Sequence, residues 1–249
     1  MANGLIAALG IFGVLACVLF FVRVHPSRKS CFEGIDDEQA ARAYNRISHW
    51  PQFRALRRMI VRELGRGRPK GLLADLGCGP GLLTTLIAKK FPGLNVLGLD
   101  TAAEMIKTAA ANALHLGLQG RIEFKEGDIG DLPLPDRMLD FAVSTMSLHH
   151  WSAPERGLAE IHRVLKPGGQ FLLFDLRRDA RLIFYLLIKF ATSIVVPPAL
   201  RRFNEPLGSL LASYTPAEIR DLFARSPFGE CRVRGGAGWM FVWAGKHKF

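Results

Sequence analysis

The chain has 249 residues and a formal net charge of +11 at pH 7, and 49% of its residues are hydrophobic. This length suits one large α/β domain with a substantial core, and no internal repeat is visible. The cysteine spacing disfavours a disulfide framework and a zinc site, because it includes no CxxC pair and no metal-ligand pattern. The cysteines are Cys17, Cys31, Cys78 and Cys231.

An uncharged apolar run covers residues 5–22, at the lower limit of length for a helix that spans a bilayer. A cleavable signal peptide is the competing interpretation. However, no positive region precedes the run, and Arg23-Val24-His25-Pro26 follows it instead of small residues. We therefore expect a membrane anchor over residues 1–24. The carboxyl side of the run is flanked by Arg23, Arg28 and Lys29, so the positive-inside rule predicts a single-pass protein with its main domain in the cytoplasm.

Residues 25–37 are predicted to be a linker, and the main domain is predicted over residues 38–249. Basic side chains gather in the helical segments at the start of this domain: Arg42, Arg46, Arg54, Arg57, Arg58, Arg62, Arg66, Arg68 and Lys70. Such a surface would attract anionic lipid or nucleic acid. The alternative is a solvated basic face that binds neither. The sequence has no RRM, KH or zinc signature, which disfavours the nucleic-acid interpretation.

A glycine-rich loop is the most informative segment. Residues 72–76 are a short apolar run, predicted to be a buried strand, and residues 82–90 have helical spacing. The loop between them reads Gly77-Cys78-Gly79-Pro80-Gly81. Alternate glycines let the backbone bend sharply and approach a ligand, and the following helix directs unpaired N–H groups at the same point. This arrangement predicts a cradle for a nucleoside cofactor.

The residues around the glycines narrow the choice of cofactor. A P-loop requires Gly-Lys-Ser/Thr, whereas Gly81 is followed by two leucines. A dinucleotide fingerprint requires its third glycine at the position of Leu82. Asp75, just before the loop, would repel a pyrophosphate and attract a cation such as an amino-acid ammonium group. The pattern favours a ligand that is a nucleoside at one end and an amino acid at the other.

Two further strands follow the glycine loop. Residues 95–99 are predicted to be a strand that ends in Asp100, at the position of a ribose-binding acid in nucleotide-binding folds. The alternative role of Asp100 is to cap the helix predicted over residues 102–116. Residues 121–125 are predicted to be the third strand, which leads into Gly127-Asp128-Ile129.

The fourth predicted strand, residues 138–144, brings Ser147-Leu148-His149-His150-Trp151 to the carboxyl edge of the sheet, where open α/β sheets bind ligands. Either imidazole has a suitable pKa to take a proton from a phenol, enol or amine. The alternative is that the histidines hydrogen-bond the backbone and shape the loop. A helix over residues 153–165 and a fifth strand over residues 170–174 are predicted next, separated by Lys166-Pro167-Gly168-Gly169.

These segments resemble motifs of the class I, Rossmann-like S-adenosylmethionine (SAM) dependent methyltransferases. Asp75-Leu76-Gly77-Cys78-Gly79-Pro80-Gly81 resembles their first motif, and Arg163-Val164-Leu165-Lys166-Pro167-Gly168-Gly169 resembles a late one. The matches span residues 44–175 and are most similar to the ubiquinone and menaquinone biosynthesis branch. The resemblance implies a seven-stranded, mostly parallel sheet with an antiparallel last strand and helices on both faces.

The resemblance also implies SAM as the cofactor. Asp128 would accept the adenine amino group, and the backbone N–H of Ile129 would reach the ring. Tyr44 matches a residue that covers SAM, although Asn45 stands where the quinone branch has an acid, and packing between two helices is the alternative for Tyr44. The full set of expected cofactor-binding residues is Tyr44, Asp75, Gly77, Cys78, Gly79, Gly81, Asp100, Thr101, Met105, Asp128, Ile129 and Ser144.

Residues 180–203 form an apolar insertion after the fifth strand. An insertion at this point of the fold often covers the substrate pocket, so we expect a lid, a membrane-interfacial helix or both. A buried core helix is the alternative. Lys189 interrupts the insertion and Pro197-Pro198 ends its apolar run, which argues against a second membrane span.

The end of the chain is predicted to complete the sheet. Thr215-Pro216-Ala217-Glu218 has the pattern of a capped helix start. Residues 230–234 and 239–244 are predicted to be two strands of a hairpin, joined by Gly235-Gly236-Ala237-Gly238.

The sequence thus predicts a membrane-anchored, cytoplasm-facing SAM-dependent methyltransferase that acts on a small hydrophobic acceptor such as a quinone precursor or a lipid. The candidate catalytic residues are His149 and His150. Methylation of protein or RNA, docked on the basic surface, is an alternative function. A SAM-binding or scaffold protein without turnover is an alternative of another class. The acceptor atom stays open, since this scaffold supports O-, N-, C- and S-methylation.

Overall fold

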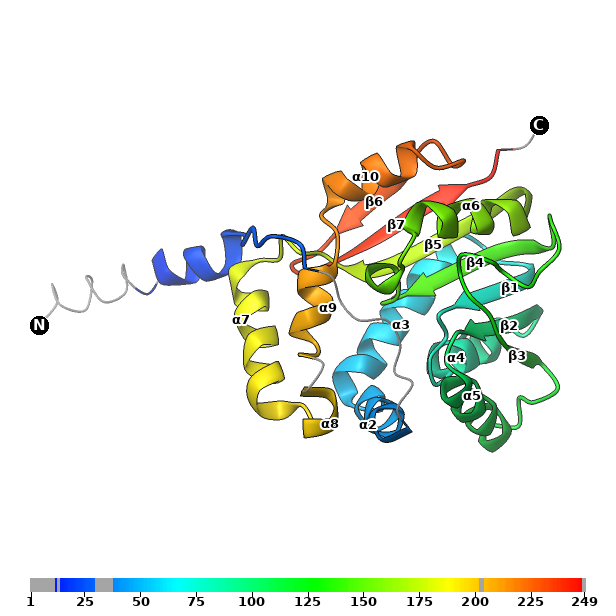
Figure 1. The fold of residues 1–249 in the computed structure, drawn as a ribbon, viewed down its shortest axis with the longest axis horizontal. Helices are drawn as coiled ribbons and strands as arrows, with labels where there is room; N and C mark the ends of the chain where they lie inside the picture. The colour runs from blue at the N-terminus through cyan, green and yellow to red at the C-terminus, as the bar shows by residue number, and fades with distance from the viewer. Residues whose placement is uncertain (1–11, 13, 30–37, 202–203, 248–249) are drawn as a thin grey trace, which may run out of the picture.

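The computed structural model describes residues 12, 14–29, 38–201 and 204–247. Seven strands form one sheet in the order β3-β2-β1-β4-β5-β7-β6, and helices cover both of its faces (Figure 1). Neighbouring strands from β3 to β5 are parallel, and β7 is antiparallel to both of its neighbours. The predicted sheet is therefore confirmed. The strands are β1 Gly71–Leu76, β2 Leu94–Asp100, β3 Ile122–Glu126, β4 Leu139–Thr145, β5 Leu165–Leu176, β6 Arg232–Gly235 and β7 Trp239–Gly245.

Apolar clusters fill the space between the sheet and the helices on each face. On one face, α3 and α4 contribute Leu64 and Ile87 to a buried cluster. On the other, α6 and α10 contribute Ile161 and Phe223. Burial on both faces explains why the central parallel strands are almost continuously apolar. The helices of these layers are α3 Pro51–Arg66, α4 Leu82–Lys90, α5 Ala103–His115, α6 Pro154–Val164 and α10 Pro216–Ala224.

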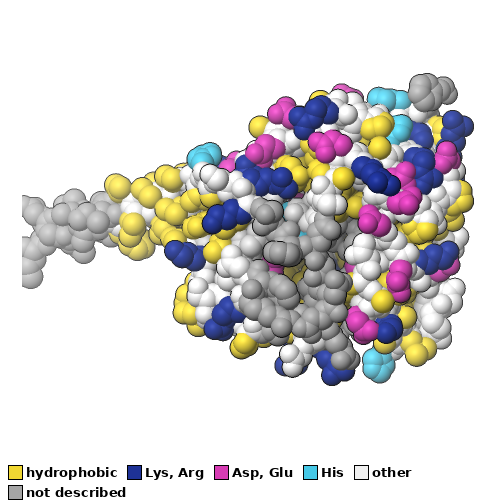
Figure 2. All heavy atoms as spheres, viewed as in Figure 1, with side chains coloured by type: hydrophobic (Ala, Val, Ile, Leu, Met, Phe, Trp, Pro, Cys, Tyr) yellow, Lys and Arg dark blue, Asp and Glu magenta, His cyan; other side chains and the backbone are white. Residues whose placement is uncertain are grey.

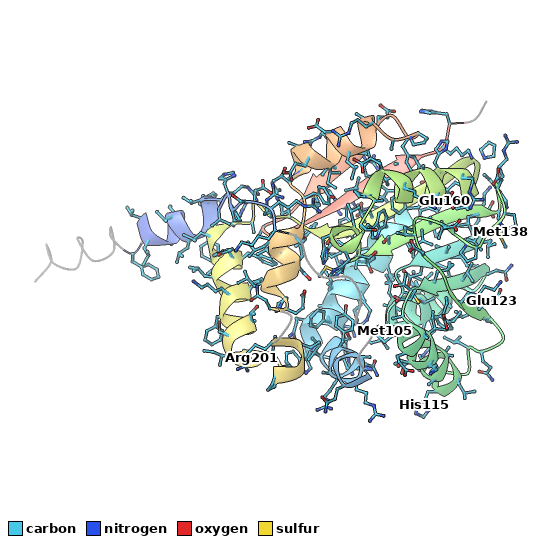
Figure 3. The ribbon with its side chains drawn as sticks, in the orientation of Figure 1. Met105, His115, Glu123, Met138, Glu160 and Arg201 are labelled. Carbon is cyan, nitrogen blue, oxygen red and sulfur yellow. The ribbon has the colours of Figure 1, made fainter. Side chains whose placement is uncertain are left out.

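The parallel register brings the loops that carry the predicted motifs to one edge of the sheet. β1 lies between β2 and β4, and Leu76 pairs with both Leu99 and Ser144 at their carboxyl ends. In Figure 3, Met105 lies at this edge, whereas Glu123 and Met138 lie at the opposite end of the sheet. The glycine loop, Asp100 and the histidine segment therefore meet in space, as parallel pairing requires.

The fifth strand begins earlier than the sequence predicts. Leu165 already pairs with Leu139, and regular pairing resumes between Phe141 and Gln170. Residues 166–169, expected to separate helix from strand, are an irregularity within β5. They are held by tertiary hydrogen bonds, because the Gly168 N–H donates to the Lys246 carbonyl at 2.8 Å. This pairing with the end of the chain overrides the local signal of proline and glycine.

The apolar insertion folds into α7 Leu182–Phe190, a π-helical turn η2 Ala191–Val195 and α8 Pro198–Arg201, and α9 Leu207–Ala212 follows. The structure describes all of α7, and none of its residues is buried. The alternative of a buried core helix is therefore wrong. α7 packs at the carboxyl edge of the sheet beside α9 (Figure 1).

Residues 14–21 are helical and extend away from the body of the molecule (Figure 1). Within the described ranges, no helix is long and apolar enough to span a membrane. Residues 1–11 and 13 of the predicted anchor lie outside the described residues, as do residues 30–37 of the predicted linker. Residues 22–29 run along the domain, where the Val24 N–H donates to the Ala180 carbonyl at 3.0 Å and the Lys29 N–H to Leu211 at 3.1 Å.

The predicted helix cap at Thr215 is present. The Glu218 N–H donates to Thr215 Oγ1 at 3.3 Å, and the Thr215 N–H donates to Glu218 Oε2 at 2.7 Å. Replacing a capping threonine by alanine costs about 1 kcal/mol. We expect Thr215→Ala to lower the free energy of unfolding by about that amount in urea titrations, with exposed Gln119→Ala as the control. Equal stability of the two variants would contradict the role of the cap.

Candidate active site

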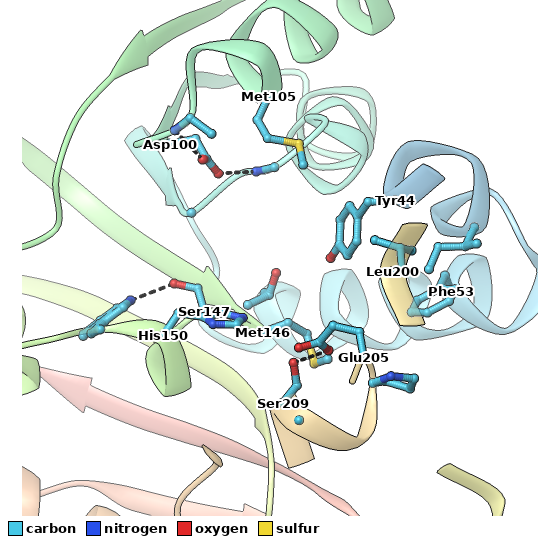
Figure 4. Close-up of a pocket in the computed structure, with 18 of the residues that line it drawn as sticks. Tyr44, Phe53, Asp100, Met105, Met146, Ser147, His150, Leu200, Glu205 and Ser209 are labelled. Carbon is cyan, nitrogen blue, oxygen red and sulfur yellow. Dashed lines mark hydrogen bonds between the residues drawn. The ribbon is translucent and has the colours of Figure 1, made fainter. Parts of the chain in front are cut away.

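The loops at the carboxyl edge enclose a cavity of about 900 Å³. On one side it is bounded by residues at the carboxyl ends of β1, β2 and β3: Gly77, Gly79, Asp100 and Asp128. Its other side is formed by α3, α7, α9 and α2 Glu38–Ser48, and Figure 4 shows residues of both sides facing a shared space. The volume is typical of a small-molecule site. Of the predicted residues, the following line it: Tyr44, Gly77, Gly79, Asp100, Thr101, Met105, Asp128, Ile129 and His150.

The glycine loop is held in a shape that requires glycine. Gly77 has φ +75°, and a Cβ atom there would lie 2.8 Å from Ser147 Oγ. Gly81, the N-cap of α4, has φ +70°, and its Cβ would lie 2.7 Å from Ala109 Cβ. Both positions favour glycine for backbone and steric reasons. The N–H groups of Gly77 and Cys78 donate to the Leu99 carbonyl at 2.8 and 2.9 Å, which fixes the loop across the end of β2.

Asp100 joins the glycine loop to the start of α5. Its Oδ2 accepts the Gly79 N–H at 2.8 Å, and its Oδ1 accepts the Ala102 N–H at 3.0 Å (Figure 4). The N-cap of α5 is Ala102, and no side chain caps this helix, so the alternative role of Asp100 as the helix cap is wrong. Its carboxylate instead connects the two loops. A carboxylate oxygen can accept more than one hydrogen bond, so Asp100, on the cavity wall, can still accept from ribose hydroxyls.

Asp75 lies beneath the loop. Thr84 Oγ1 donates to its Oδ2 at 2.6 Å, while its Oδ1 has no hydrogen-bond partner within the described part of the chain. Burial raises the pKa of Asp75 to about 7, the Thr84 hydrogen bond opposes this, and the negative charge of Asp100 adds to it. Asp75 is 1% exposed and does not line the cavity, so the structure does not bring the predicted contact with an ammonium group to the cavity surface.

Some predicted contact residues lie behind the cavity wall. Cys78 is buried, and Gly81 shapes the loop without reaching the cavity. Ser144 is also buried, and its Oγ donates to Ser147 Oγ at 3.3 Å. Ser147, which lines the cavity, in turn accepts a hydrogen bond from Trp151 Nε1 at 2.8 Å. Four predicted cofactor-binding residues are therefore outside the cavity lining and support its wall: Asp75, Cys78, Gly81 and Ser144.

Tyr44 lies between the two sides of the cavity. Its ring packs against Ala102 and Met105, and its Cε1 lies 3.9 Å from where a Cβ of Gly79 would be. Figure 4 shows its hydroxyl pointing into the cavity. Burial raises the pKa of Tyr44 to about 12, and the negative charges of Glu205 and Asp100 contribute. The hydroxyl therefore keeps its proton at neutral pH and can donate to a ligand.

The structure separates the two histidines, which the sequence left equivalent. His150 lines the main cavity, where Figure 4 shows it beside Ser147. His149 is outside that lining, and its Nδ1 lies 2.7 Å from Asp175 Oδ1 in a buried pair. Burial lowers the pKa of His149, but the charge and hydrogen bond of Asp175 outweigh it, so the net shift is upward. His150 is therefore the imidazole that can meet an acceptor.

The sequence analysis did not identify the polar residues on the far wall of the cavity. Ser209 of α9 donates from its Oγ to Glu205 Oε2 at 2.6 Å, and both residues face the cavity (Figure 4). The rest of this wall is largely apolar and includes Ile47, Trp50, Phe53, Met146, Phe184 and Ile188. The only signal in the sequence is a carboxylate in a stretch rich in apolar residues, which does not by itself place Glu205 in a site.

Comparisons with known proteins agree with this geometry. Residues 74–173 match the family described as "Methyltransferase domain". The 2-phytyl-1,4-naphtoquinone methyltransferase of Nostoc sp. is 30% identical over 167 residues, which are 65% of this chain and 72% of that protein. The chain belongs to the SAM-dependent methyltransferases.

Two further comparisons extend the similarity. The demethylmenaquinone methyltransferase of Thermus thermophilus is 31% identical to this methyltransferase over 151 residues, 61% of this chain and 67% of the relative. The crystal structure of a SAM-dependent methyltransferase from Aquifex aeolicus has the same fold, with a TM-score of 0.59 and 20% identity over 84% of this chain and 98% of that chain. The cofactor is therefore SAM, and the wall of the cavity around Gly79 and Asp100 could hold it.

Asp100→Asn is expected to weaken SAM binding by roughly ten-fold or more. Its carboxylate accepts two N–H groups on different oxygens, so an amide would set a donor against one of them, and a hydrogen bond to an ionised acceptor contributes about 1.5–3 kcal/mol. Isothermal titration calorimetry measures the Kd. The matched control is Glu104→Gln in α5, which removes the charge of a partly exposed carboxylate. Glu104 pairs with Lys107 of the same helix. An unchanged Kd for Asp100→Asn would refute this role.

The buried carboxyl of Asp75 predicts a pH dependence of stability without ligand. Its folded-state pKa, about 7, exceeds the ordinary value of 3.8, so between these values the folded protein binds more protons than the unfolded chain. The free energy of unfolding contributed by this group therefore falls as pH rises through that window. We expect urea titrations to show this loss in the wild type and to show less of it in Asp75→Asn. A difference between the two proteins that is independent of pH would contradict the assignment.

Proposed function

We propose that this methyltransferase transfers the methyl group of SAM to a small hydrophobic, membrane-soluble acceptor such as a quinol or a lipid. The observation that carries the proposal is the apolar far wall of the cavity, next to a cofactor wall that is polar. Relatives named for phytylnaphthoquinone and demethylmenaquinone substrates support an acceptor of this chemistry. The apolar lining also favours such an acceptor over RNA, whose backbone phosphates are charged.

A bound SAM supplies an electrophilic methyl group on a sulfonium. The protein's task is to hold the acceptor in line with that methyl and to exclude water. Ile47, Phe53 and Ile188 would contact the apolar body of the acceptor, and His150 would accept the proton that its hydroxyl loses as the nucleophile forms. The proton then passes to solvent, so the products are the methylated acceptor, S-adenosylhomocysteine and H⁺.

We further propose that the N-terminal apolar segment, residues 5–22, anchors the enzyme with its catalytic domain in the cytoplasm. The described part of this segment is helical and exposes Phe12, Phe20 and Phe21, which water solvates poorly. The basic residues that support this orientation lie on the domain side. Arg23 donates to the Asp179 carbonyl at 2.8 Å and Arg28 to Ala212 at 2.8 Å, so the end of the segment is joined to the domain.

The first test is methyl transfer from labelled SAM to a demethylated prenyl naphthohydroquinone in phospholipid vesicles, with total bacterial lipid extract as a second acceptor source. We expect labelled product in the organic phase, and we expect it only when the full-length protein is present. Transfer to protein or RNA instead would support the alternative substrate class. SAM binding without product from any source would support the non-catalytic alternative.

His150→Gln is expected to lower kcat by about 10²–10⁴ and to flatten the acid limb of the pH-rate profile, because a general base contributes that much. The SAM Kd should not change. His149→Gln is the matched variant. We expect it to destabilise the fold through loss of the Asp175 pair while retaining more activity at temperatures where it stays folded. If His150→Gln turns over at the wild-type rate, His150 is not the base.

A further inference from the structure

Exposed hydrophobic side chains are concentrated on two segments that lie next to each other. Among the described residues, all exposed large hydrophobic side chains except Leu114 and Leu116 belong either to residues 12–22 or to α7 and η2. On α7 and η2 the exposed fractions are 42% for Leu186, 58% for Leu187, 55% for Phe190, 64% for Ile194 and 48% for Val195. We call these five residues the outer face. Its size and continuity indicate an interaction surface.

The start of α7 is joined to the end of the N-terminal helix. The Leu182 N–H donates to the Val22 carbonyl at 2.9 Å, and Arg23 and Arg181 form an isolated antiparallel bridge. The Arg181 guanidinium also lies over the Phe21 ring, 5.7 Å from its centroid. Figure 1 shows α7 running crosswise to the N-terminal helix. If the helix of residues 14–21 lies along the membrane normal, α7 therefore lies along the membrane plane.

Charge on the insertion fits an anionic bilayer. Residues 180–203 contain four basic residues and no Asp or Glu: Arg181, Lys189, Arg201 and Arg202. Figure 2 shows Lys and Arg side chains among the hydrophobic ones where the N-terminal helix meets the body of the molecule. Basic residues beside an apolar helix face are the pattern of a helix in the membrane interface, because they reach lipid phosphates while the apolar face enters the acyl region.

The opposite side of the same helix lines the active-site cavity. Phe184, Ile188 and Ala191, spaced by four and three residues, face the cavity, and Leu187 borders both the cavity and the outside. The wall between cavity and surroundings is thus one helix thick at this point. A π-helical turn follows at η2, where Thr192 accepts the Leu207 N–H at 3.1 Å and so ties the turn to α9. Such turns interrupt regular helix packing and are frequent at functional sites.

We propose that the outer face of α7 and η2 lies in the interface of an anionic bilayer and that the acceptor enters the cavity from the membrane past this helix. The entry route rests on the proposed function, in which the acceptor is membrane-soluble. The membrane contact itself does not rest on the proposed function, and it is tested separately.

Contact is tested on the full chain in vesicles of phosphatidylcholine and phosphatidylglycerol. An NBD fluorophore is attached to Ile194→Cys in a background with Cys17, Cys31 and Cys231 replaced by Ser, and the matched label is at Leu114→Cys. We expect lipid-borne doxyl groups to quench the label at 194 and a water-soluble nitroxide to quench the label at 114. Quenching at 194 only by the soluble nitroxide, or protection from both quenchers as in a dimer, would overturn the proposal.

Entry of the acceptor into the cavity is tested with the double variant Phe190→Glu/Ile194→Glu, because neither residue lines the cavity. The control is Leu114→Glu/Leu116→Glu, which adds the same charges at another exposed site. The acceptors are a long-chain prenyl naphthohydroquinone in vesicles and a short-chain one dispersed in water. We expect the first variant to lose about ten-fold in rate with the vesicle acceptor only. Equal loss with both acceptors would overturn the entry route. If the wild type methylates neither acceptor, the proposed function fails, while the quenching result still decides the membrane contact.

Discussion

The parallel pairing of β1 between β2 and β4 is the constraint on which the rest of the site depends. Leu76 pairs with Leu99 on one side and with Ser144 on the other, so three chain segments end at the same level of the sheet. Side chains and N–H groups that are more than twenty residues apart in sequence can then hydrogen-bond, as Gly79 and Asp100 do at 2.8 Å. Because the strands are buried on both faces, a slip in register would disrupt the close packing of side chains against both helical layers. The packing of the sheet thus determines the geometry of the glycine loop.

The two halves of the cavity are built in different ways. The cofactor half consists of short loops between neighbouring strands, held by backbone hydrogen bonds and by a carboxylate that joins two of them. The other half, which we propose holds the acceptor and call the acceptor half, comes from helices far apart in the chain, including α2 before the sheet and α7 and α9 after β5. Tyr44 is the residue at which the halves meet, since the charges of both Asp100 and Glu205 act on its hydroxyl. Such a division lets one cofactor site serve acceptors of different shape, because the helices of the acceptor half can change without disturbing the strands.

Much of the fold could be predicted from local patterns. Short apolar runs marked the strands, and Thr215 with Glu218 marked a capped helix, because these signals depend on neighbours in the chain. The start of β5 could not be predicted, since Gly168 is held in place by Lys246 from the far end of the sequence. The position of the insertion could not be predicted either. A helix of such apolar composition can lie in a protein core or at a membrane, and its composition is the same in both places. Only the packed structure shows that α7 has an exposed side and a side facing the cavity.

The sequence by itself determined the cofactor side: strand, glycine loop, Asp100 and Asp128 follow one another at spacings that parallel α/β folding converts into a binding edge. The tertiary structure alone decided the acceptor side. It placed His150 in the cavity and His149 against Asp175, although the two are adjacent and chemically identical. It also brought Glu205 and Ser209 opposite the cofactor loops. The physical reason is that cofactor binding rests on backbone geometry within short segments, whereas the environment of a side chain depends on which distant helices pack around it.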